Sequence, residues 1–278
     1  MVATICVLVL RLREQWPIIA SDVYRMHILP ASGALLSTLA LLLLMSTGWT
    51  FALQAVGVSI SIRSSFSIYY QTDIFHYLPG AVWHLPGRAY LCQQRGISIT
   101  TFAQSAFFEL FFLSGCAAIL AGWGMAIYLA RPEFLVVSLV AAAALGIVIA
   151  WPERLLYLAR RQALPPGVIH RSSLLVMLLI YTAVWFFYGG AVTLLLHALP
   201  GTQPPPLLRV VITNTTAWAA GFLSLAPAGL GVRELGLSVM LGADLSAAAV
   251  VASLTQRVME LCLEGLLWGV AKLVARNH

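Results

Sequence analysis

Two charged motifs stand beside proline and glycine in otherwise apolar sequence, and their residue types suit the binding of an anionic head group. The first runs from Tyr77 to Arg88 and contains two Pro-Gly pairs, a histidine and the arginine itself. The second runs from Pro227 to Glu234 and ends in two adjacent charges, Arg233 and Glu234. A broken backbone offers unpaired N–H groups, and a guanidinium matches the geometry of a phosphate.

Each motif also has a purely structural interpretation. The first fits an interfacial turn in which Trp83 joins an aromatic belt and Arg88 extends to the lipid head groups. The second fits an ion pair that closes a turn at the glycines, whose backbone freedom permits it. A charge at bilayer depth costs about 3 kcal/mol or more, so Arg233 should be paired or face a cavity. The sequence leaves the first motif open and favours a binding role for the second.

Further charges lie inside long apolar segments. Arg257, Glu260 and Glu264 are spaced so that they share one face of a helix. Glu109 lies in an earlier apolar helix. We expect Glu109 to approach Arg257, because their charges are opposite and their positions match in the repeat described below. Such a pair could be a structural bridge, or it could take part in head-group binding or proton coupling.

Spacings typical of catalysis or metal binding are absent from the sequence. It contains no GxSxG, HExxH or P-loop motif, and its cysteines and histidines lack metal-like spacing. A glycosyltransferase would need a nucleotide-sugar domain or an acidic pair on a loop at the membrane edge, and neither is evident. We therefore expect no catalytic residue, no metal and no cofactor.

The elements that must position these residues are membrane helices. Of the 278 residues, 60% are hydrophobic and 9% are charged, whereas soluble domains carry about 25% charged residues. This composition excludes soluble enzymes, disordered chains, coiled coils and disulfide scaffolds. The net charge of +6 fits the basic loops of a membrane protein, so we expect no nucleic-acid partner. We predict an all-α, polytopic integral membrane protein with a single membrane domain over residues 1–278.

Several apolar runs are long enough to cross a hydrocarbon core of about 30 Å. They cover Ile28–Leu53, Thr101–Ile127, Phe134–Trp151, Ser173–Leu199 and Leu245–Val274. The mixed segment Arg11–His27 is expected to lie along the interface. Met1–Leu10 is apolar but too short to span, so it is either part of a first helix or an interfacial segment.

Two further stretches, Ile62–Leu91 and Leu207–Leu241, are apolar but interrupted by glycine and proline. Each continues into a long helix, and Pro79 precedes Glu109 by 30 residues, as Pro227 precedes Arg257. Broken segments at matching places in two halves indicate a transporter site at membrane depth.

We therefore predict two inverted repeats with Pro/Gly-broken re-entrant helices, the alternative being a coincidence between two kinked helices. The repeats cover residues 28–127 and 173–274, with broken segments at 62–91 and 207–241. A connecting helix and a basic cytoplasmic loop occupy residues 134–172.

The basic residues predict the orientation. Trp151–Ser172 carries four arginines and should be cytoplasmic, whereas Pro200–Pro206 has no charge and suits an outside loop. This assignment places Arg88 and the C-terminus on the cytoplasmic side of the cell (inner) membrane. It also places Arg11, Arg13 and Arg25 outside, against the rule.

At these motifs the chain resembles the lysylphosphatidylglycerol synthase transmembrane family, also called flippase-like. The resemblance rests on Leu78-Pro79-Gly80-Ala81-Val82-Trp83 with Gly87-Arg88, and on Pro227-x-Gly229-Leu230-Gly231-Val232-Arg233-Glu234, and it covers about Ile28–Val274. It implies a membrane domain that moves a lipid head group between leaflets. The aminoacyl-transferase domain of the bifunctional members has no room in this chain. The sequence departs from the family pattern at Ala228, where a second glycine is common, and in its short N-terminus.

We accordingly predict a lipid translocase that binds an anionic or lipid-phosphate head group in a polar cavity near the midplane. The expected binding residues are Pro79, Gly80, Trp83, Arg88, Glu109, Gly229, Gly231, Arg233, Glu234, Arg257 and Glu260. The expected partner is a membrane lipid, either a phospholipid or an isoprenoid-linked one, and a second copy of the chain or a lipid-modifying enzyme is also open. Two alternatives are a membrane glycosyltransferase (or its subunit) acting on a lipid-linked sugar, and a non-transporting scaffold for lipid-modifying enzymes.

Overall fold

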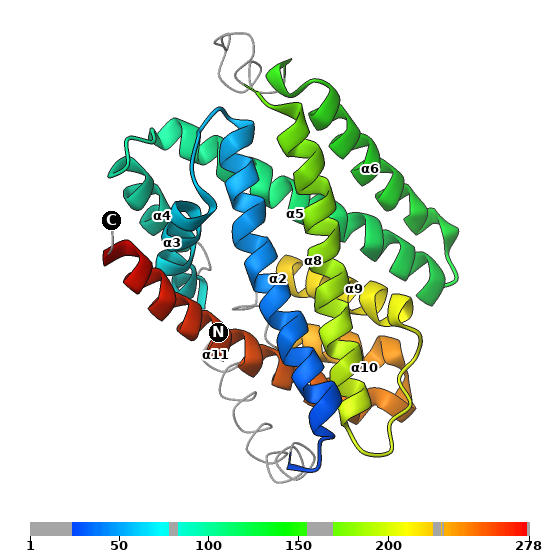
Figure 1. The fold of residues 1–278 in the computed structure, drawn as a ribbon. Coiled ribbons are helices and arrows are strands. Elements are labelled where there is room, and N and C mark those ends of the chain that lie inside the picture. The colour runs from blue at the N-terminus through cyan, green and yellow to red at the C-terminus, as the bar shows by residue number, and fades with distance from the viewer. Residues whose placement is uncertain (1–23, 78–82, 155–168, 225–228, 230, 277–278) are drawn as a thin grey trace.

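A computed structural model describes residues 24–77, 83–154, 169–224, 229 and 231–276 (Figure 1). Every regular element within these ranges is helical, which confirms the all-α fold class. The α-helices are α2 (Ile28–Ala55), α3 (Ile62–Asp73), α4 (His84–Gln93), α5 (Ile99–Tyr128), α6 (Leu135–Ala150), α8 (Arg171–Ala198), α9 (Leu207–Leu223), α10 (Val232–Leu241) and α11 (Ser246–Arg276). Short 3-10 segments are η1 (Ile74–Tyr77), η2 (Pro132–Phe134) and η4 (Ala243–Leu245).

Within the described ranges, four helical segments are long and apolar enough to cross a membrane: α2, α5, Pro132–Ala150 and α8. Their bounds differ from the predicted spans by at most two residues at each end. A chain in hydrocarbon must satisfy its own backbone N–H and C=O groups, so long apolar runs form helices. The protein is therefore a multi-pass membrane protein.

The fifth predicted span, Leu245–Val274, also forms one continuous helix, α11. This helix is not among the four that are long and apolar enough to span. It carries Arg257, Glu260 and Glu264 in its central part. The helix is thus confirmed, while its crossing of the membrane stays a prediction.

The two central helices, α2 and α8, lie side by side and make the most extensive contact between any two of the described helices (Figure 1). Gly48 of α2 makes their close approach possible, because a Cβ there would lie 2.7 Å from the ring of Tyr181 on α8. Small residues at such contacts are typical of membrane helix packing. Trp49, Leu53 and Leu174 are completely buried in the same core.

A long helix, two shorter helices and a second long helix follow one another twice, as α2–α5 and as α8–α11. A short helix of each set packs against the second long helix of the other set: α3 packs against α11, and α9 packs against α5 (Figure 1). The breaks predicted within 62–91 and 207–241 are present, because each stretch contains two separate helices. The described helices therefore follow the predicted succession of elements in both halves.

The short helices of the two halves meet opposite ends of α5. At the N-terminal end of α5, one pocket is lined by Ser61 before α3, by Gly96 after α4 and by Ser98 before α5. At the C-terminal end, the Tyr128 hydroxyl donates a hydrogen bond of 3.0 Å to the carbonyl oxygen of Val239 in α10. Because α5 has 30 residues, these ends lie about 45 Å apart along its axis.

Several predictions concern residues outside the described ranges. They include the segment Met1–Leu10, most of Arg11–His27, and the arginines at 160 and 161. Pro79, Gly80 and the Ala226-Pro227-Ala228 part of the second motif also lie outside.

Candidate functional site

Arg88 is the centre of a buried charge cluster in the first half. Its side chain is 1% exposed, and it forms ion pairs of 2.9 Å with Glu109 and 3.3 Å with Asp73. Its guanidinium carbon also lies 3.9 Å from the centroid of the Tyr69 ring and 5.0 Å from that of Trp49. The predicted alternative in which Arg88 extends to the head groups is therefore wrong. Trp83 is exposed, as an aromatic belt would require.

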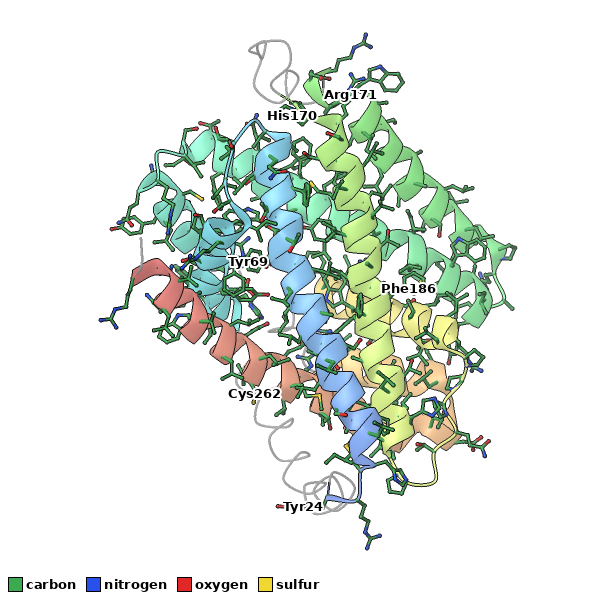
Figure 2. All side chains as sticks on the ribbon, viewed as in Figure 1. Tyr24, Tyr69, His170, Arg171, Phe186 and Cys262 are labelled. Carbon is green, nitrogen blue, oxygen red and sulfur yellow. The ribbon has the colours of Figure 1, made fainter. Side chains whose placement is uncertain are left out.

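Four helices deliver the side chains of this cluster. Trp49 comes from α2, Arg88 from α4 and Glu109 from α5. Tyr69 and Asp73 lie four residues apart on α3, so both face Arg88, and Tyr69 lies beside α2 (Figure 2). A buried guanidinium requires carboxylate partners, because removing one partner of a buried ion pair costs about 3–5 kcal/mol.

A second, largely buried ion pair lies in the other half. Arg257 of α11 approaches Glu234 of α10 to 2.7 Å. Glu234 also accepts a 2.7 Å hydrogen bond from the backbone N–H of Gly231, which has φ of +82°. The carboxylate thereby closes the glycine turn at the start of α10. The hydrogen bond from Gly231 closes the turn, whereas the ion pair of Glu234 extends outside the motif to Arg257 on the next helix.

Arg233 packs between two glycines in the same region. A Cβ on Gly221 would lie 2.5 Å from Cγ of Arg233, and a Cβ on Gly229 would lie 3.0 Å from its Cδ. The guanidinium lies over the ring of Tyr188, 5.3 Å from the centroid. Gly229 has φ of +65°, which L side chains rarely adopt. The glycines of the motif thus hold the stem of Arg233 against α8 and α9.

The expected contact between Glu109 and Arg257 is wrong. Glu109 pairs with Arg88 at 2.9 Å, and Arg257 pairs with Glu234 at 2.7 Å. In each half the charge on the long helix meets a charge on the preceding short helix. The sign is reversed between halves, because the short helix supplies the cation in the first half and the anion in the second.

Polar side chains on one face of α11 form a row between the Glu234–Arg257 ion pair and the Arg88 cluster. Gln256 Nε2 donates to Thr38 of α2 at 3.1 Å and to Glu260 at 3.3 Å. Further along, Glu264 offers a carboxylate oxygen within 4.8 Å of ligand atoms of Asp73 and His76. The helix accordingly packs against α10 near one end and against α3 near the other (Figure 1).

Two pockets open near the end where α2 finishes and α8 begins. The larger has a cavity volume of about 490 Å³, and its polar lining includes Ser61, Arg95 and Ser98. The smaller, of about 320 Å³, includes Ser59 and His170; His170 lies at the start of α8 (Figure 2). Neither pocket is lined by a predicted binding residue. A cavity at mid-depth stays a prediction.

Sequence reasoning did not find several residues of this region. Tyr69, Trp49 and Gln256 are ordinary apolar or amide residues in their segments, and only their contacts reveal their role. The sequence marks two serines of the larger pocket only weakly, as residues typical of helix N-caps. Ser61 and Ser98 are such caps, since their side chains accept hydrogen bonds from the backbone N–H groups of Ser64 and Thr101. Asp73 and His76 stood next to the first motif, but Glu264 is remote from both in sequence.

Comparison with known proteins identifies the family of the chain. The model of the family described as "Lysylphosphatidylglycerol synthase TM region" matches residues 1–263. The match includes both motifs, both buried ion pairs and all four apolar spans. No curated protein matches the chain. Because the family match covers nearly the whole chain, this protein belongs to the lysylphosphatidylglycerol synthase transmembrane-region family, a membrane family tied to lipid metabolism.

Proposed function

We propose that this protein is a lipid translocase that moves an anionic or lipid-phosphate head group between leaflets while the tails stay in the bilayer. The observation that carries the proposal is the polar face of α11, which joins two buried ion pairs. Arg257 and Glu264 are seven residues apart, which corresponds to about 10 Å along the axis. With Glu234 at one end and Asp73 at the other, the polar side chains extend further into both halves.

The cost of burying these charges supports a functional role. Arg88, Glu109, Glu234 and Glu264 are all less than a tenth exposed. Ionisable residues at membrane depth are rare and usually mark a substrate or ion pathway. An apolar core of the same shape would avoid their desolvation cost. We therefore assign them to passage of a polar group.

The arrangement of the two halves supports alternating access. The larger pocket lies beside α3 and α4 at the N-terminal end of α5, and α10 contacts the C-terminal end of α5. Inverted repeats with broken helices move a substrate by rocking one half against the other around a central site. We propose that the two halves are such repeats and that α3–α4 and α9–α10 are re-entrant pairs.

The larger pocket is proposed as the place where a head group enters. Arg95 supplies a positive charge, and the helix N-termini after Ser61 and Ser98 add partial positive charge. His170, which belongs to the basic Trp151–Ser172 segment, lines the adjacent pocket. We therefore place this end on the cytoplasmic side of the cell (inner) membrane, together with the C-terminus.

Arg233 and Arg257 are the proposed phosphate-binding groups in the second half. A guanidinium binds a phosphate through two parallel N–H···O bonds, as it binds a carboxylate. A phosphate that replaces Glu234 as the partner of Arg257 keeps the arginine paired, while Glu234 loses its cation. Glu234 would then retain its hydrogen bond from the N–H of Gly231.

Transport in vesicles tests the proposal. The purified protein is reconstituted with fluorescent phosphatidylglycerol, and a membrane-impermeant quencher reports the lipid that reaches the outer leaflet. We expect Arg233→Ala to abolish lipid movement while the protein stays folded. Arg131→Ala, which removes an exposed arginine, is the matched control and should transport normally.

Two outcomes would replace the proposal. Equal transport by wild type, Arg233→Ala and protein-free vesicles, for both phosphatidylglycerol and an isoprenoid phosphate, would favour a scaffold. Formation of a glycolipid from a labelled sugar donor by the purified chain would favour the glycosyltransferase.

A further inference from the structure

Asp73, His76 and Glu264 form a second polar group next to the Arg88 cluster. One ligand atom from each of the three lies within 4.8 Å of the other two. Asp73 ends α3, His76 lies in η1, and Glu264 comes from α11. The first two side chains are partly buried and Glu264 is buried, so these are not exposed acidic groups of the kind common on protein surfaces.

The histidine is held in a form that can bind a metal. Its Nδ1 lies 2.7 Å from the backbone carbonyl oxygen of Asp73. A carbonyl oxygen only accepts, so Nδ1 carries a proton and donates this hydrogen bond, and Nε2 is the nitrogen that a neutral ring would offer to a metal. Metal-binding histidines commonly donate their other N–H to a carbonyl or carboxylate in this way.

The charges around this group favour a cation. Asp73 and Glu264 each bring a carboxylate to this group, and both attract a divalent cation placed between them. A carboxylate has two oxygens, so Asp73 can contact Arg88 with one and a metal with the other. Buried charges are normally paired or coordinate metals.

We propose that Asp73, His76 and Glu264 form a binding site for a first-row divalent cation such as Zn²⁺. Zn²⁺ takes imidazole nitrogen and carboxylate oxygen at about 2.0–2.2 Å, and a three-residue set leaves a further position open. Small side-chain rotations bring donor atoms that are already within 4.8 Å of one another to such distances. Imidazole in the donor set favours Zn²⁺ over Mg²⁺ and Ca²⁺, which prefer oxygen ligands.

The site joins the two halves of the molecule. Two ligands belong to the first half, at the break between α3 and α4, and the third belongs to α11 of the second half. A bound cation therefore stabilises the arrangement in which α11 packs against α3. This inference does not depend on lipid transport.

Metal binding by the purified full-length protein, prepared without a polyhistidine tag, tests the site. After removal of metal with a chelator, Zn²⁺ is titrated by calorimetry, and bound metal is measured by elemental analysis after gel filtration. We expect one Zn²⁺ per chain and a higher melting temperature with Zn²⁺. His76→Gln and Glu264→Gln should weaken binding by more than about tenfold, the lower limit for loss of a partner that only supports a ligand.

Matched variants separate this site from incidental binding. Glu133→Gln and His197→Gln remove an exposed carboxylate and an exposed imidazole elsewhere, and both should bind Zn²⁺ like wild type. Asp73 also contacts Arg88, so Asp73→Asn is interpreted only alongside the two milder variants. The proposal is overturned if wild type binds no Zn²⁺, or if His76→Gln and Glu264→Gln bind it as tightly as wild type. Loss of Zn²⁺ binding with normal lipid transport would leave the translocase proposal intact.

Discussion

Glu234 on α10 and Arg257 on α11 approach to 2.7 Å and repeat, with the charges exchanged, the ion pair between α4 and α5 in the other half. In both halves a short helix after a break is thereby fixed to the long helix that follows it. Movement of a short helix must break or exchange its ion pair. The pairs are therefore the contacts whose rearrangement would accompany a change between two states.

Removing both partners of the Glu234–Arg257 pair should cost less than the sum of removing each partner alone. Arg257→Gln leaves Glu234 buried and unpaired, and we expect a loss of about 3–5 kcal/mol in the free energy of unfolding. The double variant with Glu234→Gln should lose less than the sum of the single variants, with a coupling of about 0.5–3 kcal/mol. Reversible unfolding in mixed micelles measures these values.

The exposed pair between Arg171 and Glu153, at 3.4 Å, is the control for that cycle. Both side chains are more than a third exposed, so Arg171→Gln should change stability by less than about 1 kcal/mol. Strict additivity of the Glu234 and Arg257 substitutions would show that this ion pair makes no contribution.

Arg88→Lys should destabilise the protein although it keeps the charge. A lysine ammonium cannot form the planar fork between Asp73 and Glu109 or stack on the Tyr69 ring. Loss of the desolvated ring contact alone accounts for about 2 kcal/mol. The melting temperature in nanodiscs measures the effect, and Arg95→Lys at an exposed position is the control. Equal melting temperatures for Arg88→Lys and wild type would contradict the described geometry.

Gly229→Ala should destabilise the second motif by at least about 1–2 kcal/mol, because an L residue at φ of +65° is strained. The added methyl would also lie 3.0 Å from Cδ of Arg233 and from Cα of Gly221. Gly265→Ala on α11 is the matched control. Nothing lies within 4 Å of its Cβ position, so it should be neutral or stabilise the helix by up to about 1 kcal/mol. A neutral Gly229→Ala would exclude the tight turn.

Gly48→Ala should loosen the packing of α2 on α8. The new Cβ would lie 2.7 Å from the Tyr181 ring, and overpacking a core costs about 1–3 kcal/mol. Tyr181→Leu in the same chain should recover part of the loss by making room. Gly146→Ala is the control for the effect of alanine in a helix without a steric clash, because nothing lies within 4 Å of its Cβ position. No difference between the two glycine positions would mean that α2 and α8 are further apart than described.

Most of the fold could be predicted because it follows from local properties of the sequence. An apolar run in hydrocarbon has one way to satisfy its backbone, so Ile28–Leu53 and Ser173–Leu199 had to be helices. The proline and glycine residues in 62–91 and 207–241 likewise predicted that each stretch forms two helices instead of one continuous helix. Arg257, Glu260 and Glu264 share a face of α11 through helical spacing alone.

The partners of the charges were decided by the tertiary structure. Glu109 and Arg257 have opposite charges and matching positions in the two halves. Each nevertheless pairs with a charge on the short helix of its own half, because α4 places Arg88 next to Glu109 and α10 places Glu234 next to Arg257. Spacing along the chain carries no information on such distances. The meeting of Glu264 with Asp73 and His76 depends in the same way on the packing of α11 against α3. The sequence determined which segments are helices and which of them carry charge, and the packing of those helices determined which charges meet.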